Sequence, residues 1–166
     1  YDYCDPAPQK ILLDERIEDT RCNQAYSKIV TRNYVAKDAS GNISDTCTQQ
    51  IFLKRINLNE IVFPDSLSLA TNNPLLCGSF ATDSLGRLHT SSTGVPLYHG
   101  APIWPNKDNK YCDFGASYED FVIPTGKSCT QKILRNWRFV IWYCTTFEQR
   151  VYNQLIEITD TTAPVI

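Results

Sequence analysis

The stretch IVTRNYVAKDASGNISDTCTQQIFL, residues 29–53, decides the fold. Its first part is rich in β-branched and aromatic side chains, which suit a pleated strand with one buried face. The segment Asp38–Asn42 interrupts this pattern with residue types that tight turns favour. Apolar and polar residues then alternate again from Cys47 to Leu53. The stretch therefore predicts a β-hairpin.

Short runs of this kind continue along the whole chain of 166 residues. Nine Pro and seven Gly separate them, and this arrangement is typical of an all-β sandwich. The 16 basic and 18 acidic residues nearly balance, so the charge indicates no nucleic-acid partner. No apolar run approaches the roughly 20 residues of a membrane span. Because the chain begins within a strand pattern, we interpret it as an excerpt of a longer protein.

An internal repeat is the strongest feature of the sequence. Three anchors recur in the same order about a hundred residues later. They are Tyr3-Cys4-Asp5 with Tyr111-Cys112-Asp113, Arg32-Asn33-Tyr34 with Arg135-Asn136-Trp137, and Gln49-x-Ile51-x-Leu53 with Gln154-x-Ile156-x-Ile158. We therefore expect residues 1–56 to be the C-terminal half of one sandwich repeat. Residues 57–159 would form a complete repeat, and residues 160–166 would begin the next.

Seven cysteines without a CxxC pair favour disulfides over a zinc site. Disulfides persist in oxidising compartments, so we expect a secreted, periplasmic or cell-surface protein. Aligned by the repeat, the expected bonds are Cys4–Cys22, its equivalent Cys112–Cys129, and Cys77–Cys144. The partner of Cys47 would lie upstream of Tyr1. Four cysteines in one repeat allow three pairings, so the connectivity stays open at this stage.

Arg32 and Arg135 share the parity of the apolar residues around them, which predicts that both point inward. A buried guanidinium must meet carbonyl groups or a carboxylate, because an unpaired buried charge is costly. Anion binding is the functional alternative. The structural interpretation is favoured, because the arginine recurs beside an aromatic residue in both repeats.

Residues 86–110 form a polar, Gly- and Pro-rich loop that carries the candidate ligand contacts Tyr98 and Trp104. Such loops are often functional, and these rings would stack on a sugar or a neighbouring domain. The alternative is that they cover the open end of the sandwich. His89 and His99 have no Cys or carboxylate at useful spacing, so we expect no transition-metal site.

Oxygen-rich clusters raise calcium as the one candidate cofactor, because calcium takes six to eight oxygen ligands. The candidate ligands are Asp14, Glu15, Glu18, Asp19, Asp38, Asn42 and Asp160. No spaced motif of EF-hand type appears, and such clusters are more often solvated loops. Catalytic signatures such as G-x-S-x-G or H-E-x-x-H are missing from the sequence, so we expect no enzyme.

The residues also resemble a known family. Tyr34–Asn42 with the following Cys47-Thr-Gln resembles the closing hairpin of hyalin-type, immunoglobulin-like repeats, and Asp160–Ile166 resembles the junction between such repeats. Lys132–Trp137 with Trp142-Tyr-Cys144 is similar to the variant in giant surface adhesins of Bacteroidota. These include the SprB-type gliding-motility adhesins, which the type IX secretion system exports. Residues 60–110 carry little of this resemblance.

The resemblance implies an extracellular, cell-surface glycoprotein of tandem repeats. Three tripeptides resemble the O-glycosylation acceptor of Bacteroidota and give Ser66, Ser84 and Thr161 as candidate sites. The expected function is a rigid stalk in an adhesin or filament, with neighbouring repeats, surface glycans or other cell-surface proteins as partners. A carbohydrate-binding accessory module and a structural subunit of an extracellular filament or sheath are the alternatives.

Overall fold

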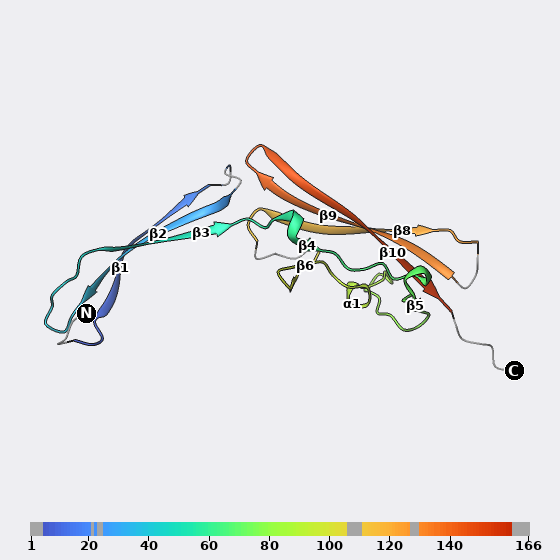
Figure 1. Cartoon of the computed structure of the whole chain (residues 1–166), viewed down its shortest axis with the longest axis horizontal. Coiled ribbons are helices and arrows are strands. Elements are labelled where there is room, and N and C mark those ends of the chain that lie inside the picture. The colour runs from blue at the N-terminus through green and yellow to red at the C-terminus, as the bar shows by residue number, and fades with distance from the viewer. Residues whose placement is uncertain (1–4, 21, 23–24, 106–110, 127–129, 161–166) are drawn as a thin grey trace. The chain divides into compact units, whose positions relative to one another are not determined.

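The computed structural model describes residues 5–20, 22, 25–105, 111–126 and 130–160 and confirms the all-β class (Figure 1). The chain divides into two compact units. The first contains Tyr1–Arg55 together with Tyr143–Thr146, and the second contains Ile56–Trp142 and Phe147–Ile166. Residues 161–166, which the sequence assigns to the start of a further repeat, lie outside the described residues.

The first unit is a three-stranded antiparallel sheet in the order β1-β2-β3. Its strands are β1 (Gln9–Asp19), β2 (Tyr26–Lys37) and β3 (Cys47–Lys54). The hairpin predicted from residues 29–53 is confirmed as β2 and β3. In its turn Gly41 has a φ of 93°, and the backbone N–H of Asn42 donates to the Asp38 carboxylate at 2.7 Å.

The second unit is built on a four-stranded sheet in the order β5-β10-β9-β8. Its long strands are β8 (Phe114–Ile123), β9 (Thr130–Tyr143) and β10 (Thr146–Thr159). Strand β5 (Leu75–Leu76) runs parallel to the end of β10. The succession β8-β9-β10 thus has the same neighbour order as β1-β2-β3 in the first unit.

Residues 56–105, called the cover segment below, supply the other layer of the second unit (Figure 1). They contain the 3-10 turns η1 (Leu58–Glu60) and η2 (Leu69–Thr71), the helix α1 (Thr90–Thr93), and the strands β4 (Ile61–Val62), β5, β6 (Leu97–Tyr98) and β7 (Ala101–Pro102). Strands β4, β6 and β7 pair into a small sheet. Polar side chains cap the turns; Ser68 and Thr71, for example, form a capping box around η2.

The core of the second unit lies between the long strands and the cover segment. Alternate residues of β9 are buried, from Ile133 to Ile141, while the residues between them are more exposed. One cluster packs Leu88 of the cover segment against Ile133, Ile156 and Ile158. The period-two pattern of the sequence therefore sets the buried face.

The disulfide of the described structure joins Cys22 to Cys144, in the turn between β9 and β10. The predicted bonds Cys4–Cys22 and Cys77–Cys144 are therefore wrong. Cys112 is a free thiol, so the predicted Cys112–Cys129 bond is absent as well. Cys47 and Cys77 are also free and exposed. Cys4 and Cys129 lie outside the described residues.

An extended strand explains why Cys77 and Cys144 do not pair. The 14 residues of β10 separate Cys77, which directly follows β5, from the turn that holds Cys144. A strand of ten residues spans about 33 Å. A disulfide needs its two Cα atoms within about 7 Å. The intervals 4–22 and 112–129 look like short closed loops in the sequence, but they contain the strands β1 and β8.

Candidate functional site

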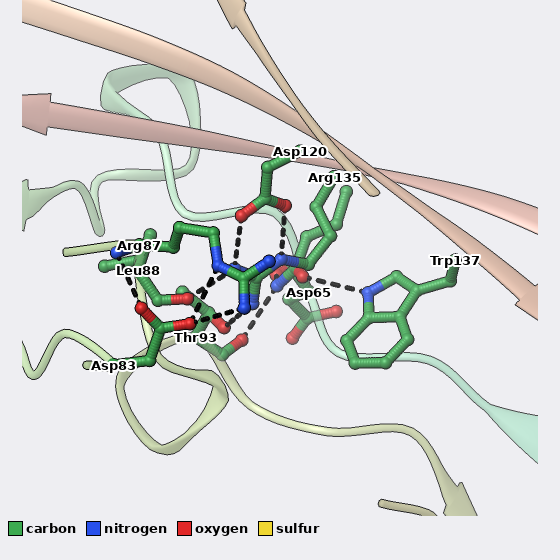
Figure 2. Close-up of polar contacts among 9 residues, drawn as sticks. Asp65, Asp83, Arg87, Leu88, Thr93, Asp120, Arg135 and Trp137 are labelled. Atoms are coloured by element: carbon green, nitrogen blue, oxygen red, sulfur yellow. Dashed lines mark hydrogen bonds and ion pairs between the residues drawn. The ribbon is translucent and has the colours of Figure 1, made fainter. Parts of the chain in front are cut away.

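The largest buried polar side chain belongs to Arg135 on β9, which has no solvent exposure. Register places Asp120 of β8 directly opposite it. The Arg135 Nε and Nη2 atoms each donate to one Asp120 carboxylate oxygen at 2.7 Å (Figure 2). This bidentate geometry is the strong form of an arginine–carboxylate pair. The prediction that Arg135 points inward and meets a carboxylate is confirmed.

The same guanidinium also binds the cover segment (Figure 2). Its Nη1 donates to the Thr93 hydroxyl at 2.6 Å, and its Nη2 donates to the Leu88 carbonyl at 2.7 Å. The Tyr118 ring lies 4.1 Å from the guanidinium carbon. Four hydrogen bonds and a ring face thus hold the charge, all supplied by the chain itself.

A second polar connection lies beside the first. The Trp137 indole N–H donates to the Gln154 side-chain oxygen at 3.2 Å. The Gln154 amide nitrogen donates to the Asp65 carbonyl at 2.9 Å and to the Thr93 carbonyl at 2.8 Å. Arg135 and Gln154 therefore bind two separate stretches of the cover segment to the sheet. We call Arg135, Asp120, Thr93, Trp137 and Gln154 the clasp.

The turn before Leu88 is itself ordered by hydrogen bonds (Figure 2). The Asp83 carboxylate accepts the backbone N–H groups of Leu85 and Arg87, each at 2.9 Å, and the Arg87 Nε at 2.8 Å. These contacts, led by the backbone N–H of Arg87, lower the pKa of Asp83 below its usual range. The ordered turn leads the chain directly into Leu88, whose carbonyl receives Arg135.

The polar groups of the clasp bind partners within the chain. Among the described residues, every buried side-chain nitrogen or oxygen has a hydrogen-bond partner. A functional anion site would need donors that the protein itself leaves unfilled. The printed contacts of the clasp are therefore contacts that pack the cover segment onto the sheet.

The first unit contains an equivalent ion pair. Glu15 of β1 lies opposite Arg32 of β2, and the Arg32 Nε donates to its carboxylate at 2.5 Å. The hydrogen bond and the charge of Glu15 raise the pKa of Arg32. Here the arginine side chain is 37% exposed. Arg32 thus meets the predicted carboxylate but, unlike Arg135, stays at the surface.

The predicted ligand contacts differ in environment. Tyr98 is half-buried and packs edge-on against Tyr111, with ring centroids 5.4 Å apart. Its hydroxyl accepts the backbone N–H of Asn57 at 3.4 Å. Trp104 is 37% exposed. Tyr98 is therefore committed to its own unit, whereas the Trp104 ring is partly accessible.

The two histidines, and Asp38 with Asn42 among the candidate calcium ligands, have partners within the chain. His99 lies 2.8 Å from Glu60, and His89 bonds the Ser91 hydroxyl at 2.8 Å. Asp38 receives Asn42 through both side chain and backbone, and the side-chain hydrogen bond of Asn42 is the main cause of its lowered pKa. Within the described ranges no group of three His, Cys, Asp or Glu residues is placed to hold a metal ion.

The candidate glycosylation sites differ in their exposure to solvent. The Ser66 hydroxyl accepts the backbone N–H of Leu155 at 3.1 Å and is partly buried. Ser84 is exposed in the turn that Asp83 organises. Thr161 lies outside the described residues. Ser84 is thus the described candidate whose hydroxyl is open to solvent.

Sequence reasoning did not assign three members of the clasp. Gln154 served only as an alignment anchor, although its match to Gln49 was a signal that the position matters. Thr93 is 42 residues from Arg135 and Asp120 is 15 residues away, so their meeting depends on tertiary structure and strand register.

In the described part of the chain, no helix has the length and apolarity needed to cross a membrane. The chain matches no family model, no curated protein and no solved structure.

Proposed function

We propose that this chain is a load-bearing segment of a secreted cell-surface adhesin or filament, in which tandem β units act as a rigid stalk. The observation that carries the proposal is the Cys22–Cys144 disulfide, which joins two residues 122 positions apart in the sequence. Such bonds persist in oxidising compartments, which supports an extracellular location.

The position of this bond matters for a protein under tension. Cys22 follows β1, and Cys144 precedes β10. Tension applied through the chain outside this interval passes along β1, through the disulfide and into β10. The backbone between the two cysteines, which includes the cover segment and both β8 and β9, is bypassed by the covalent path. A stalk gains from this arrangement because the backbone between the two cysteines cannot be extended while the bond is intact.

The clasp supports the same proposal. Its buried polar groups form hydrogen bonds to the cover segment of the same unit. These bonds hold the cover segment rigidly against the sheet. Arg32 and Arg135 are placed alike in the two units. Each lies on the middle of three successive strands and pairs with a carboxylate on the preceding strand.

Single-molecule pulling from the two ends of the chain tests the proposal. Residues 1–22 and 144–166, which are 45 of the 166 residues, lie outside the interval that the bond closes and can extend. At about 3.6 Å per residue, the oxidised chain should lengthen by no more than about 160 Å. Reduction should release about 440 Å more by the same measure. A Cys22→Ser/Cys144→Ser variant should behave like the reduced chain under both conditions. Full extension of the oxidised chain would contradict the proposal.

Carbohydrate binding remains the alternative, and the exposure of Trp104 is the observation that favours it. Aromatic faces of this kind stack on sugars. A glycan array compares the chain with its Trp104→Ala variant, and Trp142→Ala serves as a control because Trp142 is 51% exposed on β9. Binding that only Trp104→Ala abolishes would favour the alternative over a bare stalk.

A further inference from the structure

One face of the first unit's sheet is open where its equivalent in the second unit is buried. In β9, Ile133 is 6% exposed and Trp137 is fully buried. The repeat aligns them with Val30 and Tyr34 of β2, which are both only partly buried. The two strands therefore carry the same pattern of side chains, but only one of them is covered.

Strand register confirms that these faces correspond. Arg32 lies opposite Glu15, as Arg135 lies opposite Asp120. In the second unit the Leu88 carbonyl and the neighbouring Thr93 hydroxyl of the cover segment complete the shell around the arginine. No such acceptor from a cover segment reaches Arg32 among the described residues. Arg135 is therefore buried because the cover segment lies over it, and Arg32 is exposed because no such segment covers it among the described residues.

A groove of about 610 Å³ marks the open face of the first unit. Its lining includes Pro8, Lys10, Tyr34, Ala36, Cys47 and Gln49. The Lys10 ammonium lies 3.9 Å from the centre of the Tyr34 ring. The groove therefore combines an aromatic wall, a free thiol and an amide side chain.

The second unit shows what fills the corresponding place. By the repeat alignment, Cys47 corresponds to Tyr152 and Ala36 corresponds to Phe139. Phe63 of the cover segment stacks on the Tyr152 ring at 4.3 Å and lies 5.5 Å from the Phe139 ring. The groove of the first unit thus coincides with the position that Phe63 occupies in the second.

We propose that the open face binds a polypeptide segment with the chemistry of the cover segment, supplied by chain that precedes β1 in a longer polypeptide. This order follows the second unit, where the cover segment precedes the long strands. The segment offers an apolar side chain to the groove, a hydroxyl and a carbonyl to Arg32, and a carbonyl to the Gln49 amide. Because Ala36 and Cys47 are smaller than Phe139 and Tyr152, its apolar group is larger than a single phenyl ring.

Grafting the chain's own cover segment provides the test. A second copy of residues 56–110 is placed directly before Tyr3, because Tyr3-Cys4-Asp5 aligns with the Tyr111-Cys112-Asp113 that follows this segment. Cys77 is changed to Ser in the added copy only. The readout is the rate at which a small thiol reagent modifies Cys47, followed by peptide mass spectrometry. The original Cys77, which is exposed in the second unit, is the internal reference.

The graft should slow modification of Cys47 at least about tenfold relative to Cys77, since the reagent must then wait for local opening. Phe63→Ser in the added copy should restore the fast rate, because it removes the ring that enters the groove. A second version carries Ala36→Phe, which supplies the ring that Phe139 places beside Phe63 in the second unit and so allows for imperfect fit between the copies. Unchanged Cys47 reactivity in both versions would overturn the proposal.

The ungrafted chain distinguishes a rival occupant. If a second copy covers the face, Cys47 modification in the ungrafted chain should slow as protein concentration rises, and sedimentation should show a dimer. That result would also overturn the proposal, because it makes the cover intermolecular. Concentration-independent reactivity with a monomeric chain is the result expected here.

Discussion

The Arg135 guanidinium meets both carboxylate oxygens of Asp120 at 2.7 Å and is sealed from solvent by the cover segment. This pair crosses neighbouring strands, while the remaining donors of Arg135 reach across to the opposite layer. The arginine therefore does two things: it pairs β9 with β8 in register, and it binds the cover segment to the sheet.

Removing one partner of the pair should destabilise the second unit strongly. We expect Arg135→Ala to lower the free energy of unfolding by about 3–5 kcal/mol, because it leaves the Asp120 carboxylate without its partner in a poorly solvated place. Arg138→Ala, on the exposed face of the same strand, is the matched control and should change it by less than about 0.5 kcal/mol. Urea denaturation measures both. A double Arg135→Met/Asp120→Leu variant should lose less than Arg135→Ala.

The equivalent pair of the first unit should respond differently. Arg32→Ala should cost far less than Arg135→Ala, because both Arg32 and Glu15 reach solvent that can solvate the partner left behind. Hydrogen exchange of β2 amides, followed with and without the substitution, separates this unit from the second. A loss as large as that of Arg135→Ala would show that the first unit's face is covered in solution.

Gln154 should hold the cover segment against the sheet and contribute little to the pairing of β8 with β9. Gln154→Leu removes the hydrogen bonds to the carbonyls of Asp65 and Thr93, and we expect a loss of about 1–3 kcal/mol from those unsatisfied groups. Amide exchange should rise first in residues 63–67 and 90–95 of the cover segment. Asn153→Leu, at the neighbouring exposed position of β10, is the control. Faster exchange in β8 and β9 alone would contradict this role.

The sequence was informative where the physics is local. Alternation in residues 29–53 predicts the hairpin, since parity assigns each side chain to one face. The same parity, with the cost of an unpaired charge, predicts that Arg135 meets a carboxylate, which Asp120 supplies. Repeat spacing also identified corresponding positions in β2 and β9.

Contacts between residues far apart in the sequence could not be predicted from local patterns. The pairing of Cys22 with Cys144 spans 122 residues, and no local pattern connects them. Sequence spacing suggested short disulfide loops, but those intervals are occupied by extended strands. Likewise the acceptors from Leu88 and Thr93 belong to a segment with few regular elements, where periodicity predicts little.

Peptide mapping without reduction should find the fragment containing Cys22 linked to the fragment containing Cys144. Iodoacetamide added before reduction should label Cys47, Cys77 and Cys112, because these thiols are free. Loss of the bond in Cys144→Ser should lower stability by about 4–5 kcal/mol in the chain-entropy model, in which longer closed loops contribute more. A fragment linking Cys77 to Cys144 would contradict the described connectivity.

Acid should weaken the second unit through Glu157. This buried carboxylate pairs with the Lys132 ammonium and accepts the backbone N–H of Leu69 at 2.7 Å, and the Lys132 hydrogen bond is the first cause of its lowered pKa. A carboxyl whose pKa is lower in the folded state stabilises fully above its unfolded pKa of about 4.5. That contribution is lost as the pH falls from there through the lowered folded value.

Urea denaturation at a series of pH values measures this contribution. Glu157→Gln should be less stable than the parent at pH 7 and should show a shallower loss of stability below pH 4.5. Lys132→Met should also flatten the acid dependence, because removing the ammonium brings the folded pKa of Glu157 back toward its usual value. If Glu157→Gln kept the full acid dependence of the parent, other carboxylates would have to account for it and the assignment to Glu157 would fail.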